Sequence, residues 1–493
     1  MIQKTVQEDF RYLCSINGYT NKVLSILYKG IQKLEDYAKD IQFEIEDHNQ
    51  IDVKVDEIVL DTMTNCCRLL RNLCANSPAN QLILFEFHLD YKVLPLYSNI
   101  QLWGAGEFTW STKYELFIQI CTQMLCNAIT LFEKGQQSLW TLFFPGIFLK
   151  SYKNYKHIRK ILGFTSALLY NCLCDSQKKD KYIDIDSTID QTNIIYSRVY
   201  SLSNESELLN RILSSIVTYN EEEYNLDDTY MYGSFIFQKI FQYIHMQHFF
   251  ESFASSPFPV LSPSQLMILK LFHEYILDQP TYKFSLQNYL FLSSLLPQYI
   301  YSLSLPDDIY TNTSITTSTP LSKEAEQAQL TLCSEATGII MEILANFPHS
   351  YSENILKVFY ENNIHLISIA IIKIPLPLSE KTLKAAEKEG IHIPPAPEFI
   401  KTWPHGIRTS AMKLLSNLSY QNKYMQDLIR TEGCIVHILD NMKIDQDNPT
   451  LREWALFTVR NITEDNIENQ QYISEIKAQR VQVQEPLQKL GVH

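Results

Sequence analysis

The chain has 493 residues, 45% of them hydrophobic and 12% aromatic, which is enough to bury a large core. Its formal net charge of −13 argues against a nucleic-acid-binding protein, because phosphate contacts need a basic surface. Thirteen glycines are few for this length. Because tight hairpins depend on glycine, the composition favours helices over strands.

The N-terminal region is predicted to be helical and cytoplasmic. Residues 1–50 place apolar side chains at helical spacing, at Leu24, Leu27, Ile31 and Leu34. The first nine residues contain no apolar signal core, and no uninterrupted apolar run reaches the roughly 18 residues of a membrane span. The cysteines lie mostly in apolar helical runs, as free buried thiols do. We therefore expect a reducing setting, without membrane insertion.

A fixed interval recurs along the chain. The pairs Asn72/Gln81, Asn127/Gln136, Asn417/Gln426 and Asn461/Gln470 are all nine residues apart, and each Asn ends an apolar helical run. Weaker copies at Asn171 and Asn346 keep the Asn and lose the Gln. The steps from Asn127 to Asn171 and from Asn417 to Asn461 are both 44 residues. This period predicts armadillo- or HEAT-type repeats, each of which buries its apolar face against its neighbours.

The middle of the chain is less regular. Ser262 is placed to cap a helix that has Pro263 at its first position, and Gln265 completes a capping box. Residues 311–322 are rich in Ser and Thr, have too few apolar side chains to pack and are predicted to be disordered. Thr319, which precedes a proline, is a candidate phosphorylation site.

The segment 448–473 is predicted to begin with a helix that has an extensive apolar surface. Asn448 is predicted to cap it and Pro449 to occupy its first position. Apolar side chains then cover more than half of its circumference: Leu451, Trp454, Ala455, Leu456, Phe457, Val459 and Ile462. Such a helix is predicted to have neighbours on more than one side.

The predicted architecture is therefore an all-α, armadillo/HEAT-like α-solenoid with irregular middle insertions. Its parts are N-terminal repeats at 1–200, an irregular helical middle region at 201–330, C-terminal repeats at 331–480 and a tail at 481–493.

Two segments carry a family resemblance. Residues 445–470, which include Trp454, and the preceding unit at 414–439 closely resemble the C-terminal domain of the ataxin-10 family. The close match covers roughly 405–477, and a looser likeness extends over about 55–175. The resemblance implies an armadillo-like cytoplasmic adaptor, linked in that family to cytokinesis and cell-division control. It carries over no catalytic residue.

The repeated asparagines are the first candidate site. Asn72, Asn127, Asn171, Asn417 and Asn461 could line a groove and bind the backbone of an extended peptide, because an amide side chain offers both a donor and an acceptor. The alternative is that each Asn caps a helix or bridges consecutive repeats. Trp454 is either a partner anchor or a core residue. Arg460 either grips an acidic peptide or forms an ion pair.

We expect a non-catalytic scaffold that binds other proteins, with self-association as a further option and no cofactor. The phosphate-binding, nucleophile-elbow and zinc-protease motifs do not occur. A first alternative is a metal-handling accessory protein: His245 and His248, with Cys172 and Cys174 elsewhere in the chain, are the only hint of a soft-metal site, and copper is implied by the family resemblance. A second is an enzyme with an unrecognised site.

Overall fold

The computed structural model describes residues 8–46, 57–98, 112–156, 158–175, 193–217, 228–254, 261–278, 285–300, 323–346, 353–374, 403–404, 406–442 and 450–476. Every secondary-structure element assigned in these ranges is helical, so the all-α prediction is confirmed. The chain divides into two compact units, Met1–Ile244 and His245–His493. The finer division at residues 200, 330 and 480 stays a prediction. The Ser/Thr-rich loop with Thr319 and the tail lie outside the described residues.

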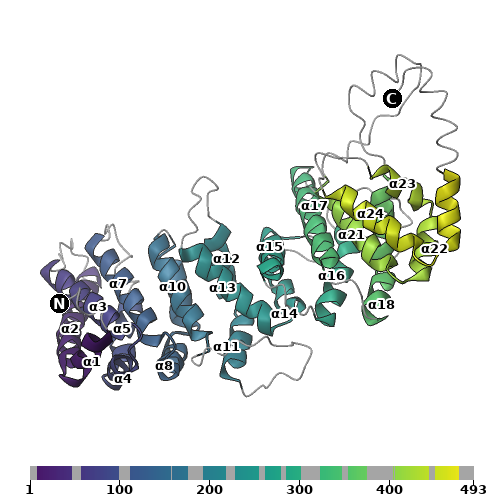
Figure 1. Ribbon diagram of the computed structural model, residues 1–493. Coiled ribbons are helices and arrows are strands. Elements are labelled where there is room, and N and C mark those ends of the chain that lie inside the picture. The colour runs from purple at the N-terminus through teal and green to yellow at the C-terminus, as the bar shows by residue number, and fades with distance from the viewer. Residues whose placement is uncertain are drawn as a thin grey trace, which may run out of the picture. The chain divides into compact units, whose positions relative to one another are not determined.

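The N-terminal unit is built on a row of long helices, each packed against the next (Figure 1). In order, this row consists of α2 (Tyr19–Glu46), α3 (Glu57–Cys74), α7 (Thr112–Ile129), α10 (Arg159–Cys172) and α13 (Asp228–Tyr243). Shorter helices flank it: α1 (Glu8–Ile16), α4 (Pro78–Glu86), α5 (Leu89–Ser98), α8 (Glu133–Phe143), α9 (Gly146–Asn154), α11 (Ile194–Ser203) and α12 (Ser206–Val217). We call the members of such a row the row helices.

Apolar spacing explains why the row helices form and pack. In α3, buried side chains recur every three or four residues, at Leu60, Met63, Cys67, Leu70 and Cys74. Each leucine buried in this way contributes about 1.5–3 kcal/mol. The four apolar residues predicted to carry α2 are likewise at most 2% exposed.

The C-terminal unit repeats the arrangement. Its row consists of α15 (Pro263–Asp278), α17 (Lys323–Ala345), α21 (Ile407–Ser419) and α24 (Leu451–Thr463), each packed against the next. The remaining elements are α14 (Met246–Phe250), η2 (Glu251–Phe253), α16 (Leu286–Tyr299), α18 (Glu353–Glu361), α19 (Ile364–Lys373), α22 (Lys423–Thr431), α23 (Cys434–Asp440) and a helix at 467–476.

The two predicted helix starts have different outcomes. The capping box before α15 is confirmed: the Gln265 N–H donates to Ser262 Oγ at 3.1 Å, and the Ser262 N–H donates to Gln265 Oε1 at 3.0 Å. α24 begins at Leu451, two residues after the predicted position. Asn448 and Pro449 lie outside the described residues.

One backbone feature explains the constant interval between each Asn and its Gln. The fourth residue after each paired Asn has a left-handed backbone, and these residues are Asn76, Leu131, Gln421 and Asp465, with φ between 49° and 56°. A left-handed residue ends a helix and redirects the chain. Because the turn is the same each time, Gln81, Gln136 and Gln426 each become the fourth residue of the following short helix.

Length and composition alone would allow α17 to cross a membrane, and the bent pair α18 and α19 passes the same test. Half of the relevant window of α17 is buried within the protein. The helix packs against α15, α16 and α21, and its Glu335 pairs with Lys270 at 2.6 Å. These contacts are those of a core helix.

Candidate functional site

The repeated asparagines connect successive row helices. Four of them donate the side-chain amide to a backbone carbonyl of the preceding row helix, and that carbonyl belongs to the residue just before the corresponding Asn. The bonds are Asn127 to Arg71 at 3.1 Å, Asn171 to Cys126 at 3.3 Å, Asn417 to Ala345 at 3.3 Å and Asn461 to Ser416 at 2.9 Å. The weaker copy at Asn346 therefore lies at the equivalent position of the row helix that precedes that of Asn417. Asn72 accepts from the guanidinium of Arg71, which also donates to Gln123 at 2.6 Å.

Two glutamines make the reciprocal connection. Gln81 donates its amide to the carbonyls of Asn127 and Thr130 at 2.9 and 3.0 Å. Gln426 donates to the carbonyls of Asn461 and Glu464 at 2.9 and 3.3 Å. In both cases the acceptors are the repeated Asn and the residue three positions later, near the end of a row helix. The last carbonyls of a helix lack partners within the helix, so these buried glutamines satisfy them.

We call this combination the Asn–Gln clasp: an Asn amide donates backward along the row, and a Gln amide donates forward. It is complete between α3 and α7, and between α21 and α24. The amide hydrogens used in the clasp already have acceptors within the protein. The role of Asn72, Asn127, Asn171, Asn417 and Asn461 in a peptide groove therefore stays a prediction.

At the end of α10, an arginine donates to the helix carbonyl in place of a glutamine. Gln136 is 1% exposed, and its amide nitrogen has no hydrogen-bond partner in the part of the chain that the structure describes. Arg198 of α11 donates instead to the carbonyl of Cys172 at 2.6 Å and to Gln137 Oε1 at 2.8 Å. Burial lowers the pKa of the Arg198 guanidinium, which is 3% exposed.

Arg408 of α21 likewise donates to the end of α19. Its guanidinium donates to the carbonyls of Ile371, Ile372 and Ile374 at 3.3, 3.2 and 2.7 Å. Sequence reasoning missed both arginines, because neither belongs to the repeated pattern. No local pattern marks either arginine as buried, and only the packed structure shows the acceptors that a buried arginine must find.

α24 exposes a face that the sequence predicts to be covered. Leu451, Ala455 and Ile462 are buried against the neighbouring helices, whereas Leu456 and Phe457 are 45% and 50% exposed. α24 packs against α21, α22 and α23, so the expectation of neighbours on more than one side holds for the helix. Leu456 and Phe457 nevertheless stay exposed.

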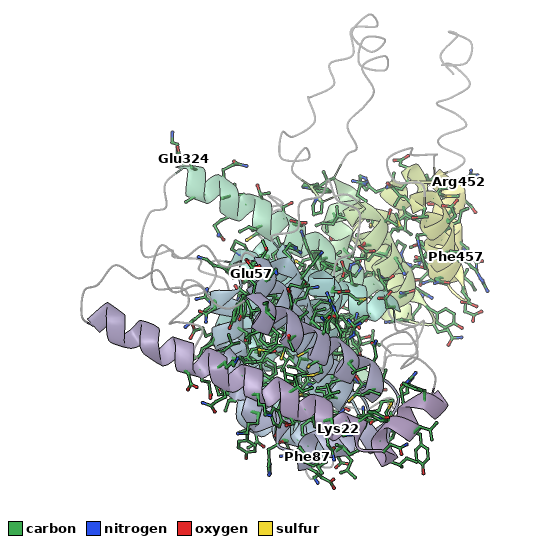
Figure 2. The ribbon with its side chains drawn as sticks, turned by 90° about the vertical axis from the view of Figure 1, so that its left-hand side faces the viewer. Lys22, Glu57, Phe87, Glu324, Arg452 and Phe457 are labelled. Atoms are coloured by element: carbon green, nitrogen blue, oxygen red, sulfur yellow. The ribbon has the colours of Figure 1, made fainter. Side chains whose placement is uncertain are left out.

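The exposed residues form a continuous strip. Arg452, Glu453, Leu456, Phe457 and Arg460 are all exposed and recur at helical spacing; we call them the α24 stripe. Figure 2 shows Arg452 and Phe457 on this helix. The predicted candidate Arg460 is part of the stripe.

Trp454 lies beside the stripe and is half-buried. Its ring is 5.7 Å from that of Phe457, and Lys413 Nζ lies 5.0 Å from its centroid. Burial lowers the pKa of Lys413, which also donates to Asn346 of the preceding layer. Trp454 thus packs on a lysine of α21 and presents its remaining surface next to Phe457.

The residues of the copper alternative are divided between the two units of the chain. Cys172 and Cys174 belong to the N-terminal unit, whereas His245 and His248 belong to the C-terminal one. Within the described ranges, no group of three or more His, Cys, Asp or Glu is placed to hold a metal ion. Burial raises the pKa of the Cys172 thiol to about 12.

Comparison with known proteins decides the nature of the C-terminal region. Residues 407–493 match the family model of the Spinocerebellar ataxia type 10 protein domain. The C-terminal segment is an ataxin-10 domain. The match starts at the first residue of α21, so the ataxin-10 domain includes the clasp between α21 and α24 and the α24 stripe. The predicted family resemblance is confirmed.

Relatives of the ataxin-10 domain come from distant organisms. An ataxin-10 homolog of Dictyostelium discoideum is 39% identical over 93 residues, which cover 19% of this chain and 15% of that protein. Ataxin-10 of Xenopus tropicalis and of Homo sapiens are 38% and 37% identical over 87 residues, 18% of either chain. The similarity thus spans less than a fifth of these relatives.

A solved chain from work on the interaction between cadherin and beta-catenin aligns with 86% of this chain and 65% of its own length. The sequence identity is 10% and the TM-score is 0.30. A likeness at this level carries no conclusion about fold or function.

Proposed function

We propose that this protein is a non-catalytic scaffold in which armadillo-like layers present surfaces to other proteins. The observation that carries the proposal is the α24 stripe, because two large apolar side chains are exposed side by side within the ataxin-10 domain. Exposed apolar residues flanked by charges are typical of protein-binding surfaces.

The chemistry of the described residues agrees with a binding role. The polar side chains that recur in the layers donate to helix carbonyls, which is a structural task. The ten cysteines are free, and nine are buried. Buried thiols with a raised pKa, such as Cys434 at about 12, are poor nucleophiles.

The proposed setting is the cytoplasm of dividing cells, with a role in cytokinesis and cell-cycle control. This part of the proposal rests on the resemblance to the ataxin-10 family. Depletion of the protein should increase the fraction of binucleate cells, and re-expression of the full chain should restore normal division. An unchanged fraction after depletion would contradict the role in division but not the scaffold.

Affinity purification with quantitative mass spectrometry tests the scaffold itself. The full chain is compared with a chain truncated before Ile407, which lacks the ataxin-10 domain. We expect the truncated chain to lose a defined set of proteins. Only losses count, because truncation uncovers apolar surfaces on α17 and α19 that attract chaperones. An unchanged set of bound proteins would contradict the proposal.

A further inference from the structure

The α24 stripe corresponds to a face that is covered one layer earlier. A shift of 44 residues, which superposes Asn461 on Asn417, places Leu456 on Met412 and Phe457 on Lys413. Met412 is fully buried, and its carbonyl accepts from Thr458 of α24 at 3.3 Å. The equivalent Leu456 is 45% exposed. The face of α21 that α24 covers is therefore present again on α24, but uncovered in the described chain.

Gln470, in the helix at 467–476, also lacks, among the described residues, a contact that its equivalent makes one layer earlier. It occupies the position of Gln426, and both donate to the carbonyl seven residues earlier: Gln426 to Ser419 at 3.2 Å and Gln470 to Thr463 at 2.8 Å. Gln426 then also donates forward to the end of α24. Gln470 is exposed and, within the described residues, makes no such forward bond. An amide nitrogen carries two hydrogens, so Gln470 can still donate one to the end of an incoming helix.

The charges of the stripe indicate what kind of helix fits. Arg452 and Arg460 flank Leu456 at intervals of four residues, and neither has an ion-pair partner among the described residues. Glu453 is the single acidic residue of the stripe, so the net charge of the stripe is +1. The chain as a whole carries −13, so the stripe is a basic strip on an acidic protein.

We propose that the α24 stripe is the docking site for an acidic amphipathic helix of another protein. The guest would place apolar residues at helical spacing on Leu456 and Phe457, and carboxylates opposite Arg452 and Arg460. Its last carbonyls would accept from Gln470, as the end of α24 accepts from Gln426. This inference rests on the proposed scaffold function and names the chemistry of one partner.

Charge disfavours two other candidates for binding to the α24 stripe, the segment 477–493 of this chain and the stripe of a second copy. The segment 477–493 carries Lys477, Arg480 and Lys489 against one acid, Glu485, so it is repelled by the two arginines of the stripe. Two copies of the stripe facing each other would also bring like net charges together.

Fluorescence anisotropy with the full chain and two labelled helical peptides of about 18 residues, long enough for several turns, tests the inference. The peptides share one leucine stripe, flanked by glutamates in one and by lysines in the other. We expect the glutamate peptide to bind about tenfold more tightly, with a preference that shrinks as salt is added. Arg452→Glu/Arg460→Glu should abolish or reverse the preference, whereas Lys156→Glu/Lys160→Glu, an equal charge change on exposed lysines of the N-terminal unit, should leave the preference for the glutamate peptide in place.

Equal binding of the two peptides, or a preference that survives Arg452→Glu/Arg460→Glu, would overturn the inference. A photo-crosslinking residue at position 457 of the full chain separates the occupants. Cross-links to residues 477–493 of the same chain, or to a second copy, would also overturn it. If the peptides fail but bound proteins still depend on residues 407–493, the scaffold stands and this inference falls.

Discussion

The side-chain amide of Gln426 lies 2.9 Å from the backbone carbonyl oxygen of Asn461, and Gln81 makes the same bond to Asn127 at 2.9 Å. The two bonds lie in different units of the chain, and each joins a short helix to the end of the next row helix. A hydrogen-bonded glutamine thus gives two of the four nine-residue intervals a structural role.

Asn417 tests the backward half of the clasp. Asn417→Ala leaves the carbonyl of Ala345 without this donor in a buried site, so the free energy of unfolding should fall by about 1–3 kcal/mol. Urea denaturation measures the change. Replacement of Asn461 by alanine should cost less, because Asn461 is half-buried and water can take the place of its amide beside the carbonyl of Ser416. If both variants unfold like the wild type but lose a bound protein, the peptide-groove hypothesis is right.

The left-handed turn predicts a stabilising substitution. Gln421 has φ of 49°, a conformation that costs a residue with a side chain about 1–2 kcal/mol and glycine much less. Gln421→Gly should therefore raise the free energy of unfolding by up to about 1 kcal/mol. Tyr420 has φ of −64°, so Tyr420→Gly should be destabilising. Loss of stability in both variants would show that the turn is not strained at Gln421.

Replacement of Arg198 should lower the stability of the N-terminal unit. Arg198→Met keeps much of the side-chain length but leaves the carbonyl of Cys172 unpaired, at a cost of about 1.5–3 kcal/mol. Arg198→Lys should not restore stability, because one ammonium cannot reproduce the two-pronged contact with Cys172 and Gln137. Hydrogen exchange should accelerate at the end of α10. Full recovery with lysine would contradict this account.

The C-terminal unit should lose stability in mild acid. Burial lowers the pKa of His365 from its ordinary 6.5, and the same cause lowers the pKa of His437. The unfolded chain then takes up protons at a higher pH than the folded chain. Stability is therefore full above about pH 7 and declines as the pH falls below about 6.5.

Thermal unfolding at pH 7 and pH 5 measures this effect. His365→Gln cannot bind the proton and should reduce the difference between the two midpoints. The contact between His273 Nε2 and Glu342 at 3.5 Å, which lowers the pKa of Glu342, acts on the carboxylate in a more acidic range, because a carboxylate titrates near pH 4. An unchanged difference in His365→Gln would exclude His365 as the cause.

The sequence predicted the repeated positions but not their partners. The nine-residue interval identifies Asn417 and Gln426 as equivalent to Asn72 and Gln81, because one local turn produces it. The acceptors are 35 to 72 residues away in the chain, and only packing of the layers brings them near.

Two further features depend on the fold rather than on local pattern. Arg198 stands outside the repeat, so no interval marks it. The exposure of Leu456 and Phe457 could not be predicted, because a row helix has the same apolar pattern whether or not another layer follows. The resemblance to the ataxin-10 family did predict the region in which these residues lie.

Hydrogen exchange of the full chain, measured by mass spectrometry, tests the clasp most directly. It compares Gln81→Leu, Gln426→Leu and Gln470→Leu with the wild type. We predict faster exchange in the last turn of α7 for Gln81→Leu and in the last turn of α24 for Gln426→Leu, and a smaller effect on α24 for Gln470→Leu, because the exposed Gln470 makes one bond to the end of α24, at Thr463. Unchanged exchange at both helix ends, or equal effects of all three substitutions, would contradict the account.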